Sequence, residues 1–283
     1  MINKIEITPS GNCLTIQSQI NSDVFNNVCS EKLEIIKYLN YKPNEKDLKI
    51  INNYFKTNKK PRLEVENYHI PFLPEAEKFS MTRYNEEAID LLKNNTVRKL
   101  TFWYGPEDKK KLDLTKLLIF KDTLEELCFR EGNYKNLEIT INGLKNLKAL
   151  SLEKLKIDFS LIEHDSLEYF FHFGSKTADW SNAANFKKLR HCTIWTNHKI
   201  ETLDFLQKMT NLEYIELDQC SKITHFPNLE HLKNLRKIVL SGNKRLDDSV
   251  EVESELKKLK NLKNVKNNFE DGYYDLIEWS YHY

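Results

Sequence analysis

Histidine, cysteine and carboxylate side chains are the groups from which this sequence would have to build a reactive or metal-binding site. Its eight histidines are scattered, without the i, i+4 pair or the cysteine pairs that typically hold a metal ion. The adjacent residues His191 and Cys192 have the types of a general base and a thiol nucleophile. Cys128 stands between Glu126 and Arg130, and a neighbouring cation can activate a thiol. These two cysteines are the candidates for thiol chemistry that their neighbours suggest.

Neither cysteine amounts to an active site once its surroundings are considered. Both lie in short stretches that read as β-strands, where consecutive side chains point to opposite faces. His191 and Cys192 therefore cannot meet, and we expect Cys192 in the core and Cys128 on the surface as an ordinary thiol. No phosphate loop, GxGxxG, HExxH, GxSxG or EF-hand pattern occurs. The sequence predicts no metal, no cofactor and no catalytic activity.

The composition bears on partners and on compartment. The 283 residues carry 43 basic and 42 acidic side chains, a formal balance of +1 that does not favour nucleic acid or a membrane surface. No stretch approaches the roughly 18 apolar residues of a membrane span, and residues 1–12 lack the apolar region of a signal peptide. Five widely spaced cysteines, an odd number, indicate reduced thiols. We expect a cytoplasmic protein, of bacterial origin by its Lys-, Asn- and Ile-rich composition.

An LxxLxL frame recurs along two thirds of the chain. Its first positions follow one another at steps of 20 to 27 residues, a spacing that neither a helix bundle nor a β-sandwich would maintain. Asn197, Cys220 and Asn243 each stand three residues after the end of a frame, where a side chain can bond backbone groups that no neighbouring strand reaches. The seven clear frames start at Val97, Leu124, Leu147, Leu167, Leu189, Leu212 and Leu235.

This pattern resembles the leucine-rich repeat family, and the resemblance covers about residues 97–268. It implies an α/β solenoid of horseshoe shape, with a parallel concave β-sheet, short helices or turns on the convex side, and caps at both ends. We expect an N-terminal cap over residues 1–60, made of a hairpin from Ile5 to Ile16 and of helices, one over 30–39 and one that Asn44 caps. The solenoid is expected over 61–268, with degenerate repeats at 61–96, and an aromatic C-terminal cap over 269–283.

Strand alternation turns the frame into a map of outward-facing side chains. If the fourth and sixth positions fill the core, the third, fifth and seventh positions face the concave sheet. In the frame that starts at Leu167, three rings then stand on that face, and the next two frames add more. An aromatic patch rimmed by charge is typical of an interface. We predict a partner-binding surface made of Trp103, Arg130, Glu153, Tyr169, Phe171, Phe173, His191, Trp195, Tyr214, Glu216 and Asp218.

Two alternatives to this map stay open. A register slip of one residue would bury the three outward rings of this frame and expose Phe170 and His172, and His172 is an uncomfortable core residue because a buried imidazole needs partners. Against the slip, the stretch SLEYF aligns residue for residue with NLEYI two repeats later. In the second alternative, the C-terminal residues or the loop over 176–186 fold across the patch and cover it.

The resemblance implies a non-catalytic protein–protein recognition module that binds a partner protein on its concave face, although fold alone does not fix function. We expect the protein to be monomeric alone. A more specific version is an immunity or antitoxin protein that neutralises a cognate bacterial toxin. Two further classes remain: an effector whose repeats present substrates, and a structural homodimer that uses the patch as its interface. The sequence does not identify the partner.

Overall fold

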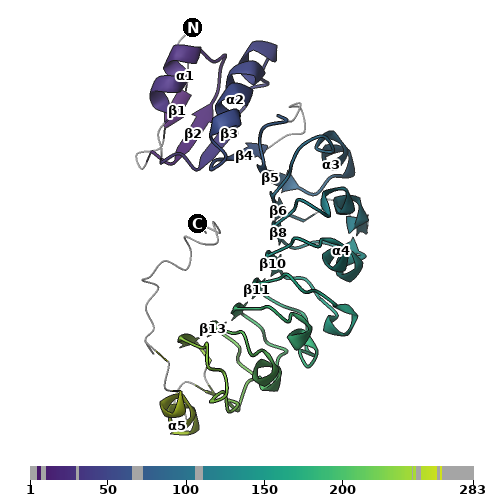
Figure 1. The fold of residues 1–283 in the computed structure, drawn as a ribbon, viewed down its shortest axis with the longest axis vertical. Helices are drawn as coiled ribbons and strands as arrows, with labels where there is room; N and C mark the ends of the chain where they lie inside the picture. The colour runs from purple at the N-terminus through teal and green to yellow at the C-terminus, as the bar shows by residue number, and fades with distance from the viewer. Residues whose placement is uncertain are drawn as a thin grey trace. The chain divides into compact units, whose positions relative to one another are not determined.

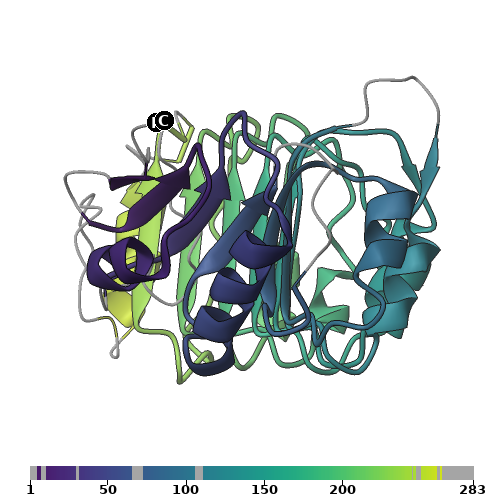
Figure 2. The same cartoon turned by 90° about the horizontal axis from the view of Figure 1, so that it is seen from above.

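The computed structural model of the chain describes residues 5–7, 11–29, 32–65, 73–105, 111–243, 245–246, 250–259 and 262. The chain divides into two compact units, Met1–Asn146 and Leu147–Tyr283. Each unit is built from short strands that are joined by turns and short helices (Figures 1 and 2). The domain boundaries predicted at residues 60 and 268 stay predictions, and the C-terminal cap predicted at 269–283 lies outside the described residues.

The sheet of the N-terminal unit begins with a hairpin and continues as parallel strands. β1 (Ile5–Ile7) pairs antiparallel with β2 (Cys13–Ile16), which confirms the predicted hairpin. From β2 onward the neighbouring strands of this unit are parallel, so the chain must return along the outer side between them. The further strands are β3 (Ile35–Tyr38), β4 (Arg62–Val65), β5 (Lys78–Arg83), β6 (Lys99–Tyr104) and β8 (Glu126–Phe129).

Short helices occupy the returns of the N-terminal unit. Three of them begin after an asparagine whose side chain accepts first-turn backbone N–H groups, namely Asn21, Asn44 and Asn85. Asn44 and Asp47 form a reciprocal capping box, which confirms the helix predicted to start there. The elements are α1 (Ser22–Val28), α2 (Glu45–Thr57), α3 (Glu86–Leu91), the 3₁₀ helix η1 (Leu114–Phe120), α4 (Leu137–Gly143) and a two-stranded sheet of β7 (Leu112–Asp113) and β9 (Tyr134–Lys135).

The helix predicted over residues 30–39 is wrong. The centre of this segment is strand β3, which pairs with β2 on one side and with β4 on the other. The spacing of Leu33 and Ile36 also fits a helix face, but the adjacent β-branched residues Ile35 and Ile36 favour a strand, and two flanking strands satisfy its backbone. The helix of this region lies earlier, at α1, which was not predicted.

Five parallel strands of five residues each make the sheet of the C-terminal unit. Neighbouring strands pair position by position, so that Tyr169 lies opposite His191, and His191 lies opposite Tyr214. The register is the one that the repeat frame predicts. The elements are β10 (Ala149–Glu153), β11 (Tyr169–Phe173), β12 (His191–Trp195), β13 (Tyr214–Asp218), β14 (Lys237–Ser241), the 3₁₀ helices η2 (Phe159–Leu161), η3 (Ala183–Asn185) and η4 (Asp204–Lys208), and α5 (Val250–Lys258).

The core of the C-terminal unit lies between this sheet and the outer turns. Phe170, at a fourth position, is 2% exposed and packs against Phe159, Trp180 and Phe186, with ring centroids 5.2 to 6.1 Å apart. Its burial excludes the one-residue slip. Trp180 comes from the loop over 176–186, so that loop packs on the core side of the sheet and does not cover the aromatic patch as the second alternative proposed.

Each strand of the C-terminal unit ends in the same turn. The residue after the seventh position has a left-handed backbone in all five repeats, with φ between 53° and 62°. In the first four repeats its N–H donates to the seventh-position carbonyl of the next strand at 2.7 to 2.8 Å. The five residues are Lys154, Gly174, Thr196, Gln219 and Gly242. This repeated bond fixes where one strand stops relative to its neighbour.

The asparagines and cysteine that follow the strands bond the backbone, as predicted. Asn197 Oδ1 accepts the N–H groups of Lys199 and Ile200 at 2.8 and 3.0 Å. Asn243 joins two repeats, because its Oδ1 accepts the Cys220 N–H and its Nδ2 donates to the carbonyl of the strand before, both at 2.8 Å. All three side chains are fully buried. With one parallel strand per frame, these contacts confirm the predicted fold class, a leucine-rich-repeat solenoid.

Candidate functional site

The open face of the C-terminal sheet, opposite its core, carries the predicted aromatic patch. The rings stand at third, fifth and seventh positions of β11, β12 and β13, and the alternation of the strands turns them away from the buried fourth and sixth positions. They are termed the aromatic face and comprise Tyr169, Phe171, Phe173, His191, Trp195 and Tyr214.

Third positions form a row of stacked side chains across four strands. The ring centroids of Tyr169 and His191 are 4.7 Å apart, and His191 lies stacked on Tyr214 at 5.7 Å. Lys237 continues the row, with its ammonium group 5.6 Å from the Tyr214 ring centroid. The sequence prediction omitted Lys237, although it stands at the third position of the Leu235 frame and could have been included on that ground.

A second ring contact runs diagonally across the same face. Phe171 packs edge-on against Trp195, with centroids 5.1 Å apart and an interplanar angle of 82°. Phe173 lies opposite Trp195 in the strand register. The seventh positions therefore read Glu153, Phe173, Trp195 and Asp218 from strand to strand, with a carboxylate on each side of two rings.

The six rings do not meet solvent equally. Tyr169, Phe173, His191 and Trp195 are partly exposed, as predicted. Phe171 and Tyr214 are only 9% and 8% exposed, so the prediction that the whole patch stands open is wrong for these two. Phe171 packs against Trp195, and Tyr214 packs against His191 and Lys237. The accessible part of the aromatic face is therefore made of the four partly exposed rings, Tyr169, Phe173, His191 and Trp195.

Glu216 is enclosed by the aromatic face and does not belong to a charged rim. It is 3% exposed, and its Oε2 accepts the Tyr214 hydroxyl at 2.7 Å. Burial raises the pKa of the Glu216 carboxyl, while the hydrogen bond from Tyr214 opposes that rise. The carboxyl therefore holds the Tyr214 ring in place. Of the predicted rim acids in this unit, Glu153 and Asp218 keep partial exposure.

Two histidines of this sheet have a depressed pKa. His191, on the aromatic face, is held at a pKa of about 4 chiefly by burial. His172 is fully buried at a sixth position, and burial lowers its pKa to about 4 as well. Its Nε2–H donates to the Leu155 carbonyl at 3.1 Å, so the core accepts an imidazole by supplying a partner. Both rings are neutral at pH 7.

Trp103 and Arg130, the two remaining predicted site residues, lie together in the N-terminal unit. The Arg130 guanidinium carbon is 4.7 Å from the centroid of the Trp103 ring, and that of Arg62 is 5.7 Å from it. Both Trp103 and Arg130 are partly exposed on the open face of their own sheet. The structure thus brings the predicted residues together in two groups, one in each unit.

The two cysteines that the sequence singled out are both buried. Cys192 is fully buried and faces away from His191, as predicted. Cys128 lies on the open face of β8, but at 5% exposure it is not the surface thiol that the sequence predicted, because a short side chain in mid-sheet is covered by longer neighbours. Among the described residues no group of three His, Cys, Asp or Glu side chains could hold a metal ion. No helix in the same residues is long and apolar enough to cross a membrane.

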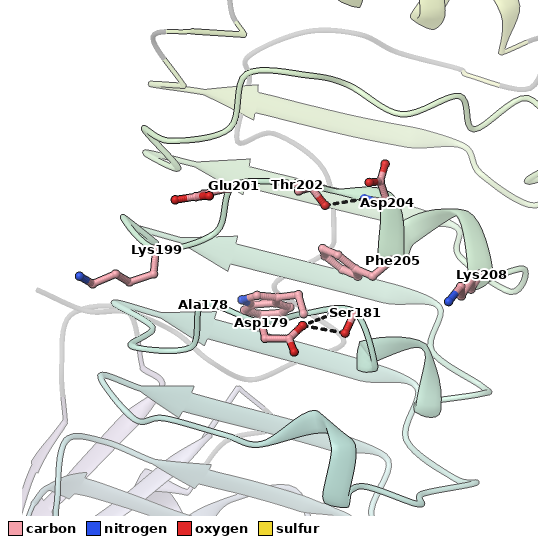
Figure 3. A pocket seen from close by; sticks show the side chains of 10 residues that line it. Ala178, Asp179, Ser181, Lys199, Glu201, Thr202, Asp204, Phe205 and Lys208 are labelled. Carbon is pink, nitrogen blue, oxygen red and sulfur yellow. Dashed lines mark hydrogen bonds between the residues drawn. The ribbon is translucent and has the colours of Figure 1, made fainter.

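A pocket of about 450 Å³ lies among the outer turns after β11 and β12 (Figure 3). Trp180 and Phe205 line it with rings 5.4 Å apart. One oxygen of the Asp179 carboxylate, Oδ1, accepts the Ser181 N–H and hydroxyl at 2.9 and 2.7 Å. Lys199 and Lys208 lie at opposite ends of the pocket (Figure 3). Its polar groups do not converge on one ligand, so the aromatic face is the stronger candidate site.

Comparison with known proteins gives partial matches. No family model matches the chain. Over 80 residues it is 31% identical to the disease resistance protein RRS1 of Arabidopsis thaliana, a stretch that is 28% of this chain and 6% of that protein. Among solved structures, the internalin inlF of Listeria monocytogenes aligns with 89% of this chain and 78% of its own, at 15% identity and a TM-score of 0.44. The leucine-rich repeat domain of the type III effector XopL aligns with 73% of this chain and 77% of its own, at 13% identity and a TM-score of 0.45.

The chain has the fold of a leucine-rich-repeat solenoid. Its own repeats carry that assignment: one parallel strand per frame, buried fourth and sixth positions, and the buried asparagine or cysteine of the turn. Solenoids of this kind present an extended sheet face on which other molecules bind. Protein–protein interaction is therefore the general class of function that the fold supports.

Proposed function

We propose that the protein is a non-catalytic recognition module that binds a partner protein on the aromatic face. One observation carries this proposal: four rings keep exposed surface on the open face, although the core of the same unit is already filled by other, fully buried rings. The fold does not need the outward rings for its core. Clusters of partly exposed aromatic side chains on a rigid sheet are the usual anchors of an interface.

The seventh-position row indicates the chemistry of that partner. Phe173 and Trp195 lie between the carboxylates of Glu153 and Asp218. Such a row suits an apolar side chain that is flanked by lysine or arginine, because the rings supply contact area and the acids supply complementary charge. That the partner is a toxin, and that the protein is monomeric alone, stay predictions.

The test is a set of alanine variants in a binding measurement. The tagged protein is purified from its native host, co-purifying proteins are identified by mass spectrometry, and the dissociation constant of each purified candidate is measured. Trp195→Ala and Phe173→Ala should each weaken binding by roughly 2 kcal/mol or more. Leu161→Ala is the matched control, since Leu161 is 59% exposed on η2 outside the open face.

The opposite order of the alanine variants would refute the proposal. If the Leu161→Ala variant lost binding and the Trp195→Ala variant did not, the partner would sit on the outer turns. Light scattering on the free protein distinguishes partner binding from the homodimer alternative. If the free protein is a dimer and Phe173→Asp dissociates it, the aromatic face serves self-association.

A further inference from the structure

A carboxylate without a partner lies beside the accessible rings of the aromatic face. Asp218, at the seventh position of β13, lies opposite Trp195 in the strand register. The side chain is partly exposed, and neither oxygen of its carboxylate makes a hydrogen bond or an ion pair with another described residue. A carboxylate in this state keeps its full capacity to accept hydrogen bonds from a ligand.

The other two carboxylates on the open face of this unit already have partners. A carboxylate oxygen of Glu153 lies 3.8 Å from the ammonium nitrogen of Lys154. Glu216 is buried, and it accepts the hydroxyl of Tyr214. Within the part of the sheet that the structure describes, Asp218 is therefore the carboxylate of this face that has both solvent exposure and unbonded oxygens.

The cations of the unit do not neutralise Asp218. Among the described strands of this sheet, Lys237 is the one lysine or arginine at an outward position. It lies four residues along β14 from the position opposite Asp218, a backbone separation of about 13 Å, and its ammonium group lies over the Tyr214 ring. Lys222, the basic residue nearest to Asp218 in the sequence, pairs with Glu201 at 3.5 Å. The Asp218 charge is therefore available to a cation of a ligand.

Two partly exposed rings continue the row from Asp218. Trp195 lies opposite Asp218 on one side and opposite Phe173 on the other. Phe173 makes no ring contact with another described residue. Neighbouring strands lie about 4.8 Å apart, so a ligand group on Trp195 is within reach of the Asp218 carboxylate, and the group next to it is within reach of Phe173.

An arginine side chain fits the pair of Trp195 and Asp218 better than a lysine does. The guanidinium group is flat, stacks on aromatic rings, and donates two parallel hydrogen bonds to the two oxygens of one carboxylate. The ammonium group of lysine is a compact point charge that cannot stack and bond both oxygens in this way. The two unbonded oxygens of Asp218 beside a partly exposed indole therefore favour arginine.

We propose that Trp195 and Asp218 receive one arginine side chain of the partner protein, with its guanidinium group on the indole ring and bonded to the carboxylate, while Phe173 packs against the apolar side chain beside it. This inference rests on the proposed function, because it names the partner residue that the aromatic face recognises. A neutral or acidic segment in the same place would desolvate Asp218 without supplying a counter-charge, so the row discriminates against such segments.

The test follows the indole N–H signals of the ¹⁵N-labelled full chain by NMR while N-acetyl-leucyl-arginine amide is added. The chain has four tryptophans, and the Trp195 signal is the one that the Trp195→Phe variant lacks. This signal should shift to saturation with the arginine peptide. N-acetyl-leucyl-citrulline amide, which has the same shape without the charge, should bind about tenfold more weakly. The matching lysine peptide should fall between the two.

Variants assign the effect to the carboxylate. Asp218→Asn keeps the shape of the side chain and removes its charge, so it should weaken binding of the arginine peptide by about tenfold. Asp204→Asn is the matched control, because Asp204 is an exposed aspartate on η4 in the outer turns of the same unit, and it should leave the affinity unchanged. Thermal melts check that both variants fold, and the citrulline peptide tests the same charge pair in the unaltered chain.

The inference is overturned if the arginine peptide leaves the Trp195 signal in place, if the citrulline peptide binds as tightly, or if Asp218→Asn keeps the wild-type affinity. A Trp195 signal that moves when the protein alone is diluted would instead assign the row to a second copy of the chain. Failure of the proposed function is distinguishable. A partner that needs Trp195 but binds Asp218→Asn as tightly as the wild type refutes this inference alone, whereas a chain that binds the peptide as expected but whose partner ignores Trp195→Ala refutes the proposed function.

Discussion

At the scale of single residues, the enclosed carboxyl of Glu216 orders the candidate site. The Tyr214 hydroxyl donates to it at 2.7 Å. A ring that a buried acceptor holds in one orientation loses less conformational freedom when a partner binds. The cost is a desolvated carboxyl, which explains the raised pKa.

The Glu216→Gln variant should be more stable than the wild type at pH 7. The folded pKa of Glu216 lies above its unfolded value of 4.5, so the folded chain holds more protons in that window and wild-type stability falls as pH rises through it. Glutamine keeps an acceptor for Tyr214 and carries no charge. The gain should be seen as a higher melting temperature at pH 7 and should vanish below pH 4.

Glu216→Leu is the control for that measurement. Leucine removes the charge and the acceptor together, so the Tyr214 hydroxyl loses its partner, and the free energy of unfolding should drop by about 1–3 kcal/mol. A Gln variant that is no more stable than the Leu variant at pH 7 would show that the hydrogen bonds to Glu216 contribute nothing.

At the scale of elements, the turn after each strand sets the spacing of the solenoid. Its left-handed residue is glycine in two repeats, Gly174 and Gly242, and a β-branched threonine in another, Thr196. The left-handed region costs a non-glycine residue roughly 1–2 kcal/mol. Thr196 stays there because its N–H donates to the Asp218 carbonyl at 2.7 Å.

Thr196→Gly should therefore stabilise the protein by up to about 1 kcal/mol, after the larger entropy that glycine gains in the unfolded chain is deducted. Chemical denaturation with urea measures this difference. Thr193 lies three residues earlier, on strand β12, where the backbone is extended. Thr193→Gly is therefore the control and should lose stability. Equal losses in both variants would mean that the Thr196 backbone is not strained.

How far the sequence predicts these elements depends on their contacts. The frame located β11 and its register, because SLEYF and NLEYI align and a parallel neighbour enforces the alignment. Strand β3 was mistaken for a helix, because the apolar residues around Ile36 fit the spacing of a helix as well as that of a strand. The pairing with β2 and β4 determines that the segment is a strand. Alternation also gave the face on which Glu216 and Cys128 lie, but it says nothing of how far longer side chains lean over them.

At the scale of the whole molecule, a formal charge of +1 conceals a division between the two open faces. In the N-terminal unit the described open face holds five cations and three carboxylates, namely Lys37, Arg62, Lys78, Lys99 and Arg130 against Glu6, Glu64 and Glu126. In the C-terminal unit it holds three carboxylates, Glu153, Glu216 and Asp218, beside one cation, Lys237, and the aromatic face. Net charge governs long-range steering, but the local sign on each face governs which segment of a partner can dock.

The most direct measurement is site-specific photo-crosslinking in the native host. A benzoylphenylalanine is placed at position 173, on the aromatic face, and in a separate protein at position 161, on the outer turns. The account predicts one protein of defined mass crosslinked from position 173 and none from position 161. Crosslinking from position 161 alone would contradict it, because the partner would then bind away from the open sheet.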